Sequence, residues 1–388
     1  MIALILFWVA VFLVVYTYMG FPLSVVLRGM LWGRPYKHEE LTALPVVSIV
    51  ISAYNEAKSI GAKLDNVLSM DYPRDFLEVV IASDGSTDGT DAIVERYKEY
   101  GVKLLSLPRL GKAAALNAAV TASSGDILVF SDANSMYKVD AIRELVRPFA
   151  DPKVGGAAGN QVYRTSTAGG STTDGEHAYW NFDRMLKQNQ SKSGSTLAAT
   201  GAIYAIRRPL FRPIPDGVSD DFFTSTGVVA QGYRLVFAPN AIAYEPAAAT
   251  SQVEFGRKVR VRIRSWNAFI FRRELLNPFR HGFYAIQFFS HKILRYLVVF
   301  PLLMLFFISP FLWKTGWIYQ LATISQVVFY LCALLGLLLH RTRFSRKKIF
   351  TIPFYFCMVN AASLVAVIKV LSGQQIKHWE PQRQSNAV

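Results

Sequence analysis

The sequence predicts an α/β domain built on a parallel β-sheet and flanked by membrane-spanning helices. Three observations support this fold class. Strand-like apolar runs alternate with helical patterns through the middle of the 388-residue chain, as in βαβ units. Both ends of the chain are strongly hydrophobic. Between them, acidic residues stand where apolar runs give way to polar turns, which is where α/β domains place ligands and metals.

The N-terminal segment predicts a helix that crosses a membrane. Residues 3–27 contain no charged residue, and about 20 apolar residues suffice to cross the hydrocarbon. A secretory signal peptide is the alternative, but the run is too long for one and no positive charge precedes it. Three more apolar runs follow near the C-terminus, at 296–313, 317–339 and 349–371, and each is long enough to span.

Basic residues orient these helices. Arg28, Arg34 and Lys37 place the inner end of the first helix in the cytoplasm by the positive-inside rule. We therefore expect an integral protein of the inner (plasma) membrane with a cytoplasmic middle domain, in which the last run either spans the bilayer or is re-entrant. The loop between the last two runs is also expected in the cytoplasm, because it carries five basic residues: Arg341, Arg343, Arg346, Lys347 and Lys348.

The composition narrows the classes of partner. The net charge is +15, but the basic residues concentrate near the apolar runs and form no nucleic-acid-binding motif. We therefore expect that the protein binds no nucleic acid. Membrane lipids, a lipid diphosphate or a nucleotide diphosphate explain the charge better. Cys332 and Cys357 both lie in apolar runs, so we expect neither a disulfide framework nor a cysteine metal site.

The middle of the chain alternates strands and helices. Residues 46–53 read as a buried strand, 57–68 as an amphipathic helix and 77–82 as a second strand. A polar turn leads to a helix over 88–100, with Asp88 as its cap. Strands follow at 102–107, 127–131 and 154–159, with a helix at 111–122. We expect the chain to divide into a transmembrane helix (1–27), the α/β domain (28–250), basic interface helices (251–295), three transmembrane helices (296–371) and a tail (372–388).

Polar motifs after the strands supply candidate ligands. The turn SDGSTDGT places Asp84 before a helix N-terminus, whose amides favour a phosphate while Asp84 reads a ribose or base; a locally stabilised turn is the alternative. Lys112, at the entry of the next helix, would neutralise a diphosphate unless it is a solvated surface lysine. Asp132, followed by Asn134, offers hard oxygen ligands for Mg²⁺ or Mn²⁺, or else caps a turn.

Two further motifs lie nearer the C-terminus. Asp220 and Asp221 are adjacent, which favours a perturbed pKa and a general base, although the pair also suits the start of a helix. The segment RKVRVRIRSWNAF reads as a basic helix at the membrane surface, and its guanidinium groups also suit a pyrophosphate clamp. Its basic residues are Arg257, Lys258, Arg260, Arg262 and Arg264.

Taken in order from 46 to 264, these motifs resemble the membrane-integrated family 2 glycosyltransferases, the group that includes cellulose, hyaluronan and poly-N-acetylglucosamine synthases. The resemblance implies a GT-A (Rossmann-like) domain. It also implies that Asp84 contacts the nucleotide, that Lys112 lies close by, and that a strand end with the YNE motif lines the nucleobase pocket. These last residues are Ala53, Tyr54, Asn55 and Glu56.

The resemblance extends to the metal, the acceptor and the base. The family's metal-binding motif matches Asp132 and Asn134, with Asn in place of the second Asp, and implies Mg²⁺ or Mn²⁺. The family's catalytic carboxylates match Asp220 and Asp221, with Asp221 as the base. Its acceptor-side glycine motif matches Thr200, Gly201 and Ala202.

The sequence departs from the family at the Q-x-x-R-W signature of polymerising members. Aligned by distance from Asp221, the signature falls on 257–261, where Arg257 replaces Gln and Val261 replaces Trp, while Arg260 keeps the arginine. This departure weakens the expectation of processive synthesis.

The expected activity is inverting transfer of a sugar from a nucleotide-diphosphate sugar to a hydroxyl of a lipid-linked or growing glycan, in cell-surface or exopolysaccharide synthesis. Asp221 would take the acceptor proton. The metal at Asp132, with Lys112 and Arg257 or Arg260, would neutralise the departing diphosphate. The alternatives are a processive polysaccharide synthase, a polyprenyl-phosphate glycosyltransferase, in which a phosphate oxygen attacks, and a non-catalytic nucleotide-binding membrane scaffold.

Overall fold

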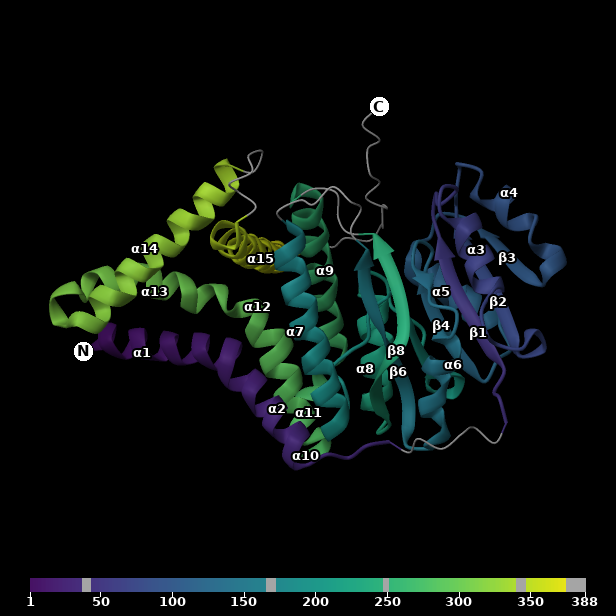
Figure 1. Cartoon of the computed structure of the whole chain (residues 1–388), viewed down its shortest axis with the longest axis horizontal. Coiled ribbons are helices and arrows are strands. Elements are labelled where there is room, and N and C mark those ends of the chain that lie inside the picture. Colours follow the sequence, from purple (N-terminus) through teal and green to yellow (C-terminus); the bar gives the residue numbers. More distant parts are fainter. Residues whose placement is uncertain (37–42, 165–171, 247–250, 340–346, 375–388) are drawn as a thin grey trace.

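One eight-stranded sheet forms the centre of the protein, in the order β3-β2-β1-β4-β7-β6-β8-β5. The computed structural model describes residues 1–36, 43–164, 172–246, 251–339 and 347–374. Figure 1 shows the sheet between helices of the middle domain on one side and the apolar helices on the other. The strands are β1 Val47–Ala53, β2 Leu77–Asp84, β3 Val102–Leu107, β4 Ile127–Asp132, β5 Met136–Tyr137, β6 Val154–Arg164, β7 Tyr204–Arg207 and β8 Arg234–Pro246.

The sheet is parallel in one half only. β3, β2, β1 and β4 run parallel, as the βαβ pattern predicts. β7 is antiparallel to both β4 and β6, while β6 and β8 run parallel to each other. The expectation of a parallel sheet is therefore wrong for the second half. β7 has only four residues, too few for a sequence pattern to separate from a loop.

Helices cover both faces of the sheet. The residues of β1 are all buried and alternate between two cores: Ile49 and Ile51 face one, and Val50 faces the other. Such burial on both faces is why the strand is continuously apolar. The first core is covered by α3 Ile60–Leu68, α4 Thr90–Glu95 and α6 Ala141–Val146, and the second by α5 Lys112–Ala122 and α8 Asp220–Ala230.

Helix α4 is shorter than the predicted helix over 88–100. It begins at Thr90, and the chain turns into the short helix η3 at Lys98. The predicted cap Asp88 still stabilises the start, because its carboxylate accepts a hydrogen bond from the Thr90 backbone N–H at 3.2 Å. The other short 3₁₀ helices are η2 Arg74–Phe76, η4 Arg147–Ala150, η5 Arg208–Leu210, η6 Arg273–Leu276 and η8 Trp313–Thr315.

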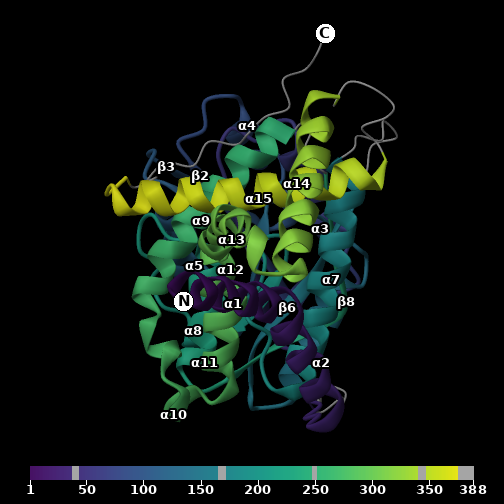
Figure 2. The same ribbon diagram turned by 90° about the vertical axis from the view of Figure 1, so that its left-hand side faces the viewer.

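A second group of helices lies beside the sheet and carries the apolar segments. α2 packs along α7, and α9 packs along α15. In Figure 1, α1 and α13 extend side by side away from the sheet, while Figure 2 shows α15 running across them. These elements are α1 Ile2–Val15, η1 Tyr16–Gly20, α2 Phe21–Leu31, α7 Thr172–Ser193, α9 Ser251–Phe271, α10 Pro278–His281, α11 Phe283–Phe288, η7 Phe289–Leu294, α12 Arg295–Leu297, α13 Val299–Phe311, α14 Trp317–Leu338 and α15 Lys348–Leu371.

Three helices of the described chain are long and apolar enough to cross a membrane: Ile2–Leu31, α14 and α15. A fourth is possible if Phe283–Leu297 and α13, bent by 50°, form one broken span. The apolar window of α15 is 39% buried inside the protein, against 11% for α14, because α15 packs on α9. Of the predicted basic loop, Arg341, Arg343 and Arg346 lie outside the described residues, whereas Lys347 and Lys348 stand at the start of α15.

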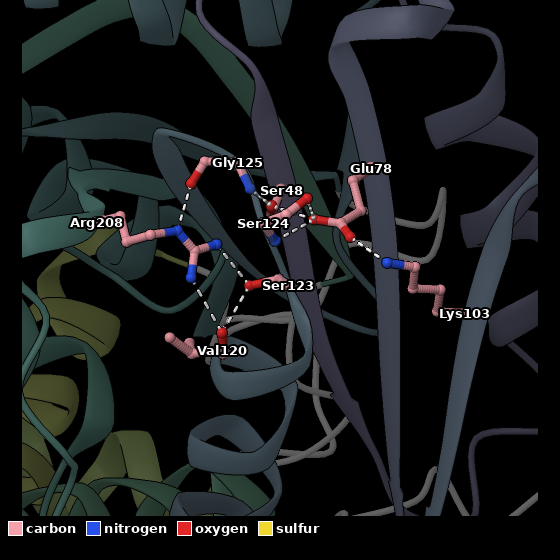
Figure 3. A network of polar contacts seen from close by, with 8 residues as sticks. All are labelled: Ser48, Glu78, Lys103, Val120, Ser123, Ser124, Gly125 and Arg208. Atoms are coloured by element: carbon pink, nitrogen blue, oxygen red, sulfur yellow. Dashed lines mark hydrogen bonds and ion pairs between the residues drawn. The ribbon is translucent and has the colours of Figure 1, made fainter.

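A polar network ties together the amino-terminal edge of the sheet (Figure 3). The Glu78 carboxylate accepts hydrogen bonds from the Ser48 hydroxyl at 2.5 Å, from Lys103 Nζ at 2.6 Å and from the Ser124 backbone N–H at 2.7 Å. Arg208 donates to the carbonyls of Gly125 and Val120 and to the Ser123 hydroxyl. A Cβ on Gly125 would lie 2.6 Å from Ser48 Oγ, so glycine permits the close approach that this network needs.

Replacing Glu78 with Gln should destabilise the protein in a pH-dependent way. Burial alone would raise the Glu78 pKa, but bonds from Lys103, Ser48 and Ser124 outweigh it and hold the pKa at about 2. The stabilisation by the Glu78 carboxylate is therefore complete above about pH 4.5, the ordinary pKa of a glutamate, and is lost as the pH falls towards 2. Chemical unfolding in detergent should show a loss of about 1 kcal/mol at pH 7.

The exposed Glu95→Gln is the matched control and should unfold like the unmodified protein. A Glu78→Gln deficit that stayed constant down to pH 2 would contradict the assigned pKa.

Candidate active site

The loops that follow β1 and β2 are bonded to each other at the carboxyl edge of the sheet. Ala53 pairs with Ser83 in the sheet register, so both strands end at the same edge. The Asn55 backbone N–H donates to Ser86 Oγ at 3.0 Å, and the Thr87 N–H donates to Asn55 Oδ1 at 2.7 Å. Asn55 adopts φ 54°, a left-handed conformation that Asn tolerates better than most residues. The YNE motif is thereby held against the SDGST turn.

Asp84 is buried beneath this edge and holds the next loop. Its side chain accepts hydrogen bonds from the Arg109 guanidinium and from the backbone N–H groups of Leu110 and Gly111, the latter two at 2.7 and 2.8 Å. The Arg109 guanidinium lies 3.3 Å from the centroid of the Tyr54 ring. These contacts fix the entry of α5 and so position its first residue, Lys112.

Lys112 bridges two carboxylates that are far apart in the sequence. Its Nζ lies 2.7 Å from Asp132 Oδ1, at the end of β4, and 3.1 Å from Asp220 Oδ2, in the first turn of α8. Burial alone would lower the pKa of Lys112, but the charges of Asp132 and Asp220 outweigh it and raise that pKa. Lys112 is therefore a permanent cation at the meeting point of three elements, and not a solvated surface lysine.

The adjacent carboxylates at the start of α8 differ in their electrostatics. Burial would raise the pKa of Asp220, but Lys112 and Arg264 outweigh burial and lower it. Burial and the charge of Asp220 raise the pKa of Asp221. Asp221 Oδ1 accepts hydrogen bonds from the Ser219 hydroxyl at 2.6 Å and from the Phe222 backbone N–H at 2.7 Å. The pair therefore contains one stably ionised carboxylate and one with raised proton affinity, the property of a general base.

A cavity of about 750 Å³ brings most of the predicted site residues together. It opens between the carboxyl edge of the sheet and the helices α7, α9 and α15. Four predicted residues, Ala53, Tyr54, Asn55 and Asp84, are not among those that line it, so their contact with a nucleotide stays a prediction. The predicted residues that line it are Glu56, Lys112, Asp132, Asn134, Thr200, Gly201, Ala202, Asp220, Asp221, Arg257 and Arg260.

The acceptor-side motif lies directly against Asp132. A Cβ on Gly201 would stand 2.9 Å from Asp132 Oδ2, which is closer than real side chains come, so a larger residue here would displace the Asp132 carboxylate. The Thr200 hydroxyl is buried without a hydrogen-bond partner among the residues that the structure describes, although it lines the cavity. An orphaned hydroxyl at a cavity wall is a natural contact for a polar ligand.

The oxygen atoms at the end of β4 suit a divalent cation that also binds a ligand. The Asp132 side chain is 34% exposed, and Asn134 lines the cavity beside it. Within the described ranges, no cluster of three or more His, Cys, Asp or Glu residues is arranged to hold a metal. A cation here would therefore be shared between these two side chains and ligand oxygens. Mg²⁺ often binds in this way, through one or two carboxylates and substrate phosphates.

Helix α9 supplies cations to the same cavity. Arg257, Arg260 and Arg264 recur at helical spacing, and all three line the cavity. Burial, then the charges of Arg264 and Arg257, lower the pKa of Arg260. This crowding of like charges favours an anionic ligand. The helix is confirmed, but its basic side chains face a cavity inside the protein. Val261, at the place of the family's Trp, also lines the cavity.

Two buried residues were not predicted to belong to the site: Lys63, and Glu245, which lines the cavity. Lys63 is fully buried: its Nζ donates to the Ser135 carbonyl at 2.6 Å and lies 3.5 Å from the Tyr137 ring centroid. Burial lowers its pKa to about 7. Glu245, at the end of β8, accepts from the Ser135 hydroxyl at 2.5 Å and from Gln161. Burial, then Asp132, raise its pKa. The sequence contains a signal for Lys63, because this charged residue interrupts the apolar face of α3.

Comparison with known proteins gives consistent results. Residues 48–214 match the family described as Glycosyl transferase family 2. Poly-beta-1,6-N-acetyl-D-glucosamine synthase of Staphylococcus epidermidis is 26% identical over 206 residues, 51% of this chain and 49% of that protein. The probable glycosyltransferase YdaM of Bacillus subtilis is 27% identical over 242 residues, 58% of this chain and 56% of YdaM. The match thus spans about half the length of these curated relatives.

A solved structure matches nearly the whole chain. The mannosyltransferase PcManGT from Pyrobaculum calidifontis, solved in complex with GDP-Man and Mn²⁺, superposes with a TM-score of 0.72 at 25% identity. The match covers 95% of this chain and 100% of PcManGT. It therefore includes the apolar helices as well as the sheet.

Replacing Lys112 with Met should destabilise the protein by about 3 kcal/mol, because the buried Asp220 loses the cation that compensates its charge. The measurement is the free energy of unfolding from denaturant titration in detergent. Lys138→Met is the matched control, since its ion pair with Asp140 is exposed, and it should change little. Equal losses in the two variants would contradict the bridging role of Lys112.

Proposed function

Because the chain carries a glycosyltransferase family 2 domain with the GT-A fold, we propose that it transfers a sugar with inversion from a nucleotide-diphosphate sugar to a hydroxyl group of a lipid-linked or growing glycan. The observation that carries the proposal is the cluster of Asp132, Lys112, Asp220 and Asp221 on one cavity wall. It combines a candidate base with a cation suited to a departing diphosphate. The product would belong to a cell-surface glycan or exopolysaccharide.

The donor diphosphate binds between the end of β4 and helix α9. Lys112 lies on one side of this space, and Arg257 and Arg260 lie on the other. Asp132 and Asn134 would hold Mg²⁺ or Mn²⁺ against the phosphate oxygens, where the cation supplies Lewis-acid stabilisation of the leaving group. The Mn²⁺ and GDP-Man bound to PcManGT support both the cation and the class of donor. The nucleobase then lies towards Tyr54 and Asp84.

Asp221 acts as the general base in this proposal. The acceptor oxygen attacks the anomeric carbon, the bond from that carbon to the diphosphate oxygen breaks, and the acceptor proton passes to Asp221. Hydrogen bonds from Ser219 and from the Phe222 N–H orient the Asp221 carboxylate. Lys112, Arg257 and Arg260 stabilise the negative charge that develops on the leaving diphosphate.

We infer that this chemistry takes place at the cytoplasmic face of the inner (plasma) membrane, and the apolar helices support a membrane location. Arg28, near the end of the first apolar helix, and Arg34, just beyond it, favour the cytoplasmic side for that end. The cavity lies where the α/β domain meets α15, so an acceptor held in the bilayer reaches the base without leaving the membrane surface. Tethering the acceptor in this way raises the effective concentration of the acceptor at the base.

A processive polysaccharide synthase is the second candidate. The similarity to poly-beta-1,6-N-acetyl-D-glucosamine synthase supports it, whereas Arg257 and Val261 in place of Gln and Trp weaken it. Product length on a defined acceptor separates the two, because single transfer adds one sugar and processive synthesis gives long chains.

Replacing Asp221 with Asn should lower kcat by about 100- to 10,000-fold while the KM for the donor changes little, because the base is lost and the diphosphate contacts remain. The measurement is nucleoside diphosphate release in detergent across UDP-, GDP- and dTDP-sugars with Mg²⁺ or Mn²⁺ and native lipid extract. The exposed Asp216→Asn is the control and should keep the original rate. Substantial turnover by Asp221→Asn would instead indicate a polyprenyl-phosphate acceptor, whose oxygen needs no base.

Replacing Gly201 with Ala should weaken cation-dependent donor binding by about tenfold, because the new methyl group would displace the Asp132 carboxylate. Isothermal titration of the accepted nucleotide diphosphate, with and without MnCl₂, measures the effect. Gly194→Ala is the control, since a Cβ there meets no atom within 4 Å. Unchanged cation dependence in Gly201→Ala would remove Asp132 from the proposed cation site.

A further inference from the structure

Helix α9 presents basic side chains in two directions. Arg257 and Arg264 act electrostatically on Arg260, as does Asp132, so this side of α9 faces the donor end of the cavity. Arg262 points elsewhere, because residues two apart on a helix lie on different faces. Its guanidinium carbon lies 5.2 Å from the centroid of the Tyr296 ring, among the helices that follow α9.

The Arg262 side chain is buried without a full set of partners. It is only 9% exposed, and its Nε has no hydrogen-bond partner among the described residues. It nevertheless lines the cavity. A guanidinium group removed from water and left without a partner is costly. An anion bound at this point would satisfy both its charge and its free N–H.

Further cations surround the same point. Lys292, Arg262 and Arg295 all act electrostatically on the Tyr296 hydroxyl, and Lys292 and Arg295 also line the cavity. The nearby carboxylate on α7, Asp183, pairs with Lys187 at 3.0 Å and also acts electrostatically on Lys292. One carboxylate thus lies among four cations, Lys187, Arg262, Lys292 and Arg295.

The cation cluster shares its cavity with the proposed base, because Asp221, Arg262, Lys292 and Arg295 all line it. Lys292 Nζ lies 5.2 Å from the centroid of the Phe222 ring, which belongs to the same helix as Asp221. A ligand held by the cluster would therefore lie in the cavity that contains the base, while the donor diphosphate occupies the other side of α9.

The wall of the cavity contributed by α15 is largely apolar. Ile352, Phe356 and Val359 line it there together with Tyr355 and Asn360, and α15 is apolar enough to cross a membrane. The cavity thus joins a cluster of cations to a hydrocarbon-like surface. This combination suits an amphiphile with a phosphate head and an apolar tail.

We propose that Arg262, Lys292 and Arg295 form a second anion subsite, which binds the phosphate group that joins the acceptor glycan to its lipid while α15 contacts the lipid. The proposal rests on the transferase function proposed above and specifies its acceptor as a phosphate-linked lipid. The subsite positions the acceptor and takes no part in bond making. It is distinct from the donor diphosphate subsite at Lys112, Arg257 and Arg260.

The test is equilibrium binding of radiolabelled farnesyl diphosphate to the detergent-solubilised protein, with farnesol and phosphatidylglycerol as comparison ligands. Binding is measured with and without a saturating mixture of UDP, GDP and dTDP in MnCl₂, which fills the donor subsite. The variants are Arg262→Gln, Arg262→Lys and Arg295→Gln, with the exposed Arg280→Gln as the matched control. Melting temperatures identify any variant that fails to fold, in which case Arg262→Lys and Arg295→Gln carry the test.

We expect farnesyl diphosphate to bind more tightly than either comparison ligand and to stay bound when nucleotides are added. Arg262→Gln and Arg295→Gln should weaken binding by about tenfold, and Arg262→Lys by less, because the charge is kept but the fork geometry is lost. Arg280→Gln should bind normally. Displacement by the nucleotides would place the probe in the donor subsite, and equal binding of phosphatidylglycerol would assign the cluster to bulk lipid; either result overturns the proposal.

The binding readout also separates this inference from the proposed transfer activity. Probe binding that depends on Arg262 but is accompanied by no donor turnover would keep the subsite and remove the transferase assignment. Donor turnover together with probe binding that none of the three variants weakens would keep the transferase assignment and remove the subsite.

Discussion

The ion bridge from Lys112 to Asp132 and Asp220 is the interaction on which the rest of the site depends. It joins the start of α5, the end of β4 and the first turn of α8, so one buried cation sets the relative positions of three elements. It also shifts the pKa values of the two adjacent carboxylates, Asp220 and Asp221, in opposite directions. Lys112 keeps Asp220 ionised, and the resulting negative charge raises the pKa of Asp221.

The cavity above this bridge belongs to neither half of the protein alone. The α/β domain supplies Asp132, Asp220, Asp221 and Lys112, and the helices that follow it supply further cations and a largely apolar wall. Helix α9 connects the two halves, since it packs on α15 while its arginines reach the carboxylates. A helix that the sequence places at the membrane surface therefore also forms part of the site. The α/β domain and the apolar helices thus line one cavity together.

The predictability of the fold differs between the two halves of the sheet. β1, β2, β3 and β4 lie close to their predicted positions, because buried parallel strands are continuously apolar and alternate with helices. β7 was missed because four residues carry no periodicity. The long helix α7 was missed because its sequence is largely polar; at its C-terminal end, Leu186 packs on Phe21 and Val25 of α2, a contact that no local pattern encodes.

The sequence by itself determined the class of fold, the apolar helices, and the identity and order of the motifs that carry the chemistry, because these follow from local periodicity and residue type. Only the tertiary structure decided that Asp84 holds the loop before α5, that Lys112 faces two carboxylates, and that Arg262 lies buried beside Tyr296. The physical reason is that pairing and burial depend on which distant segments meet. A charge acquires its pKa and its partner only when those segments have packed.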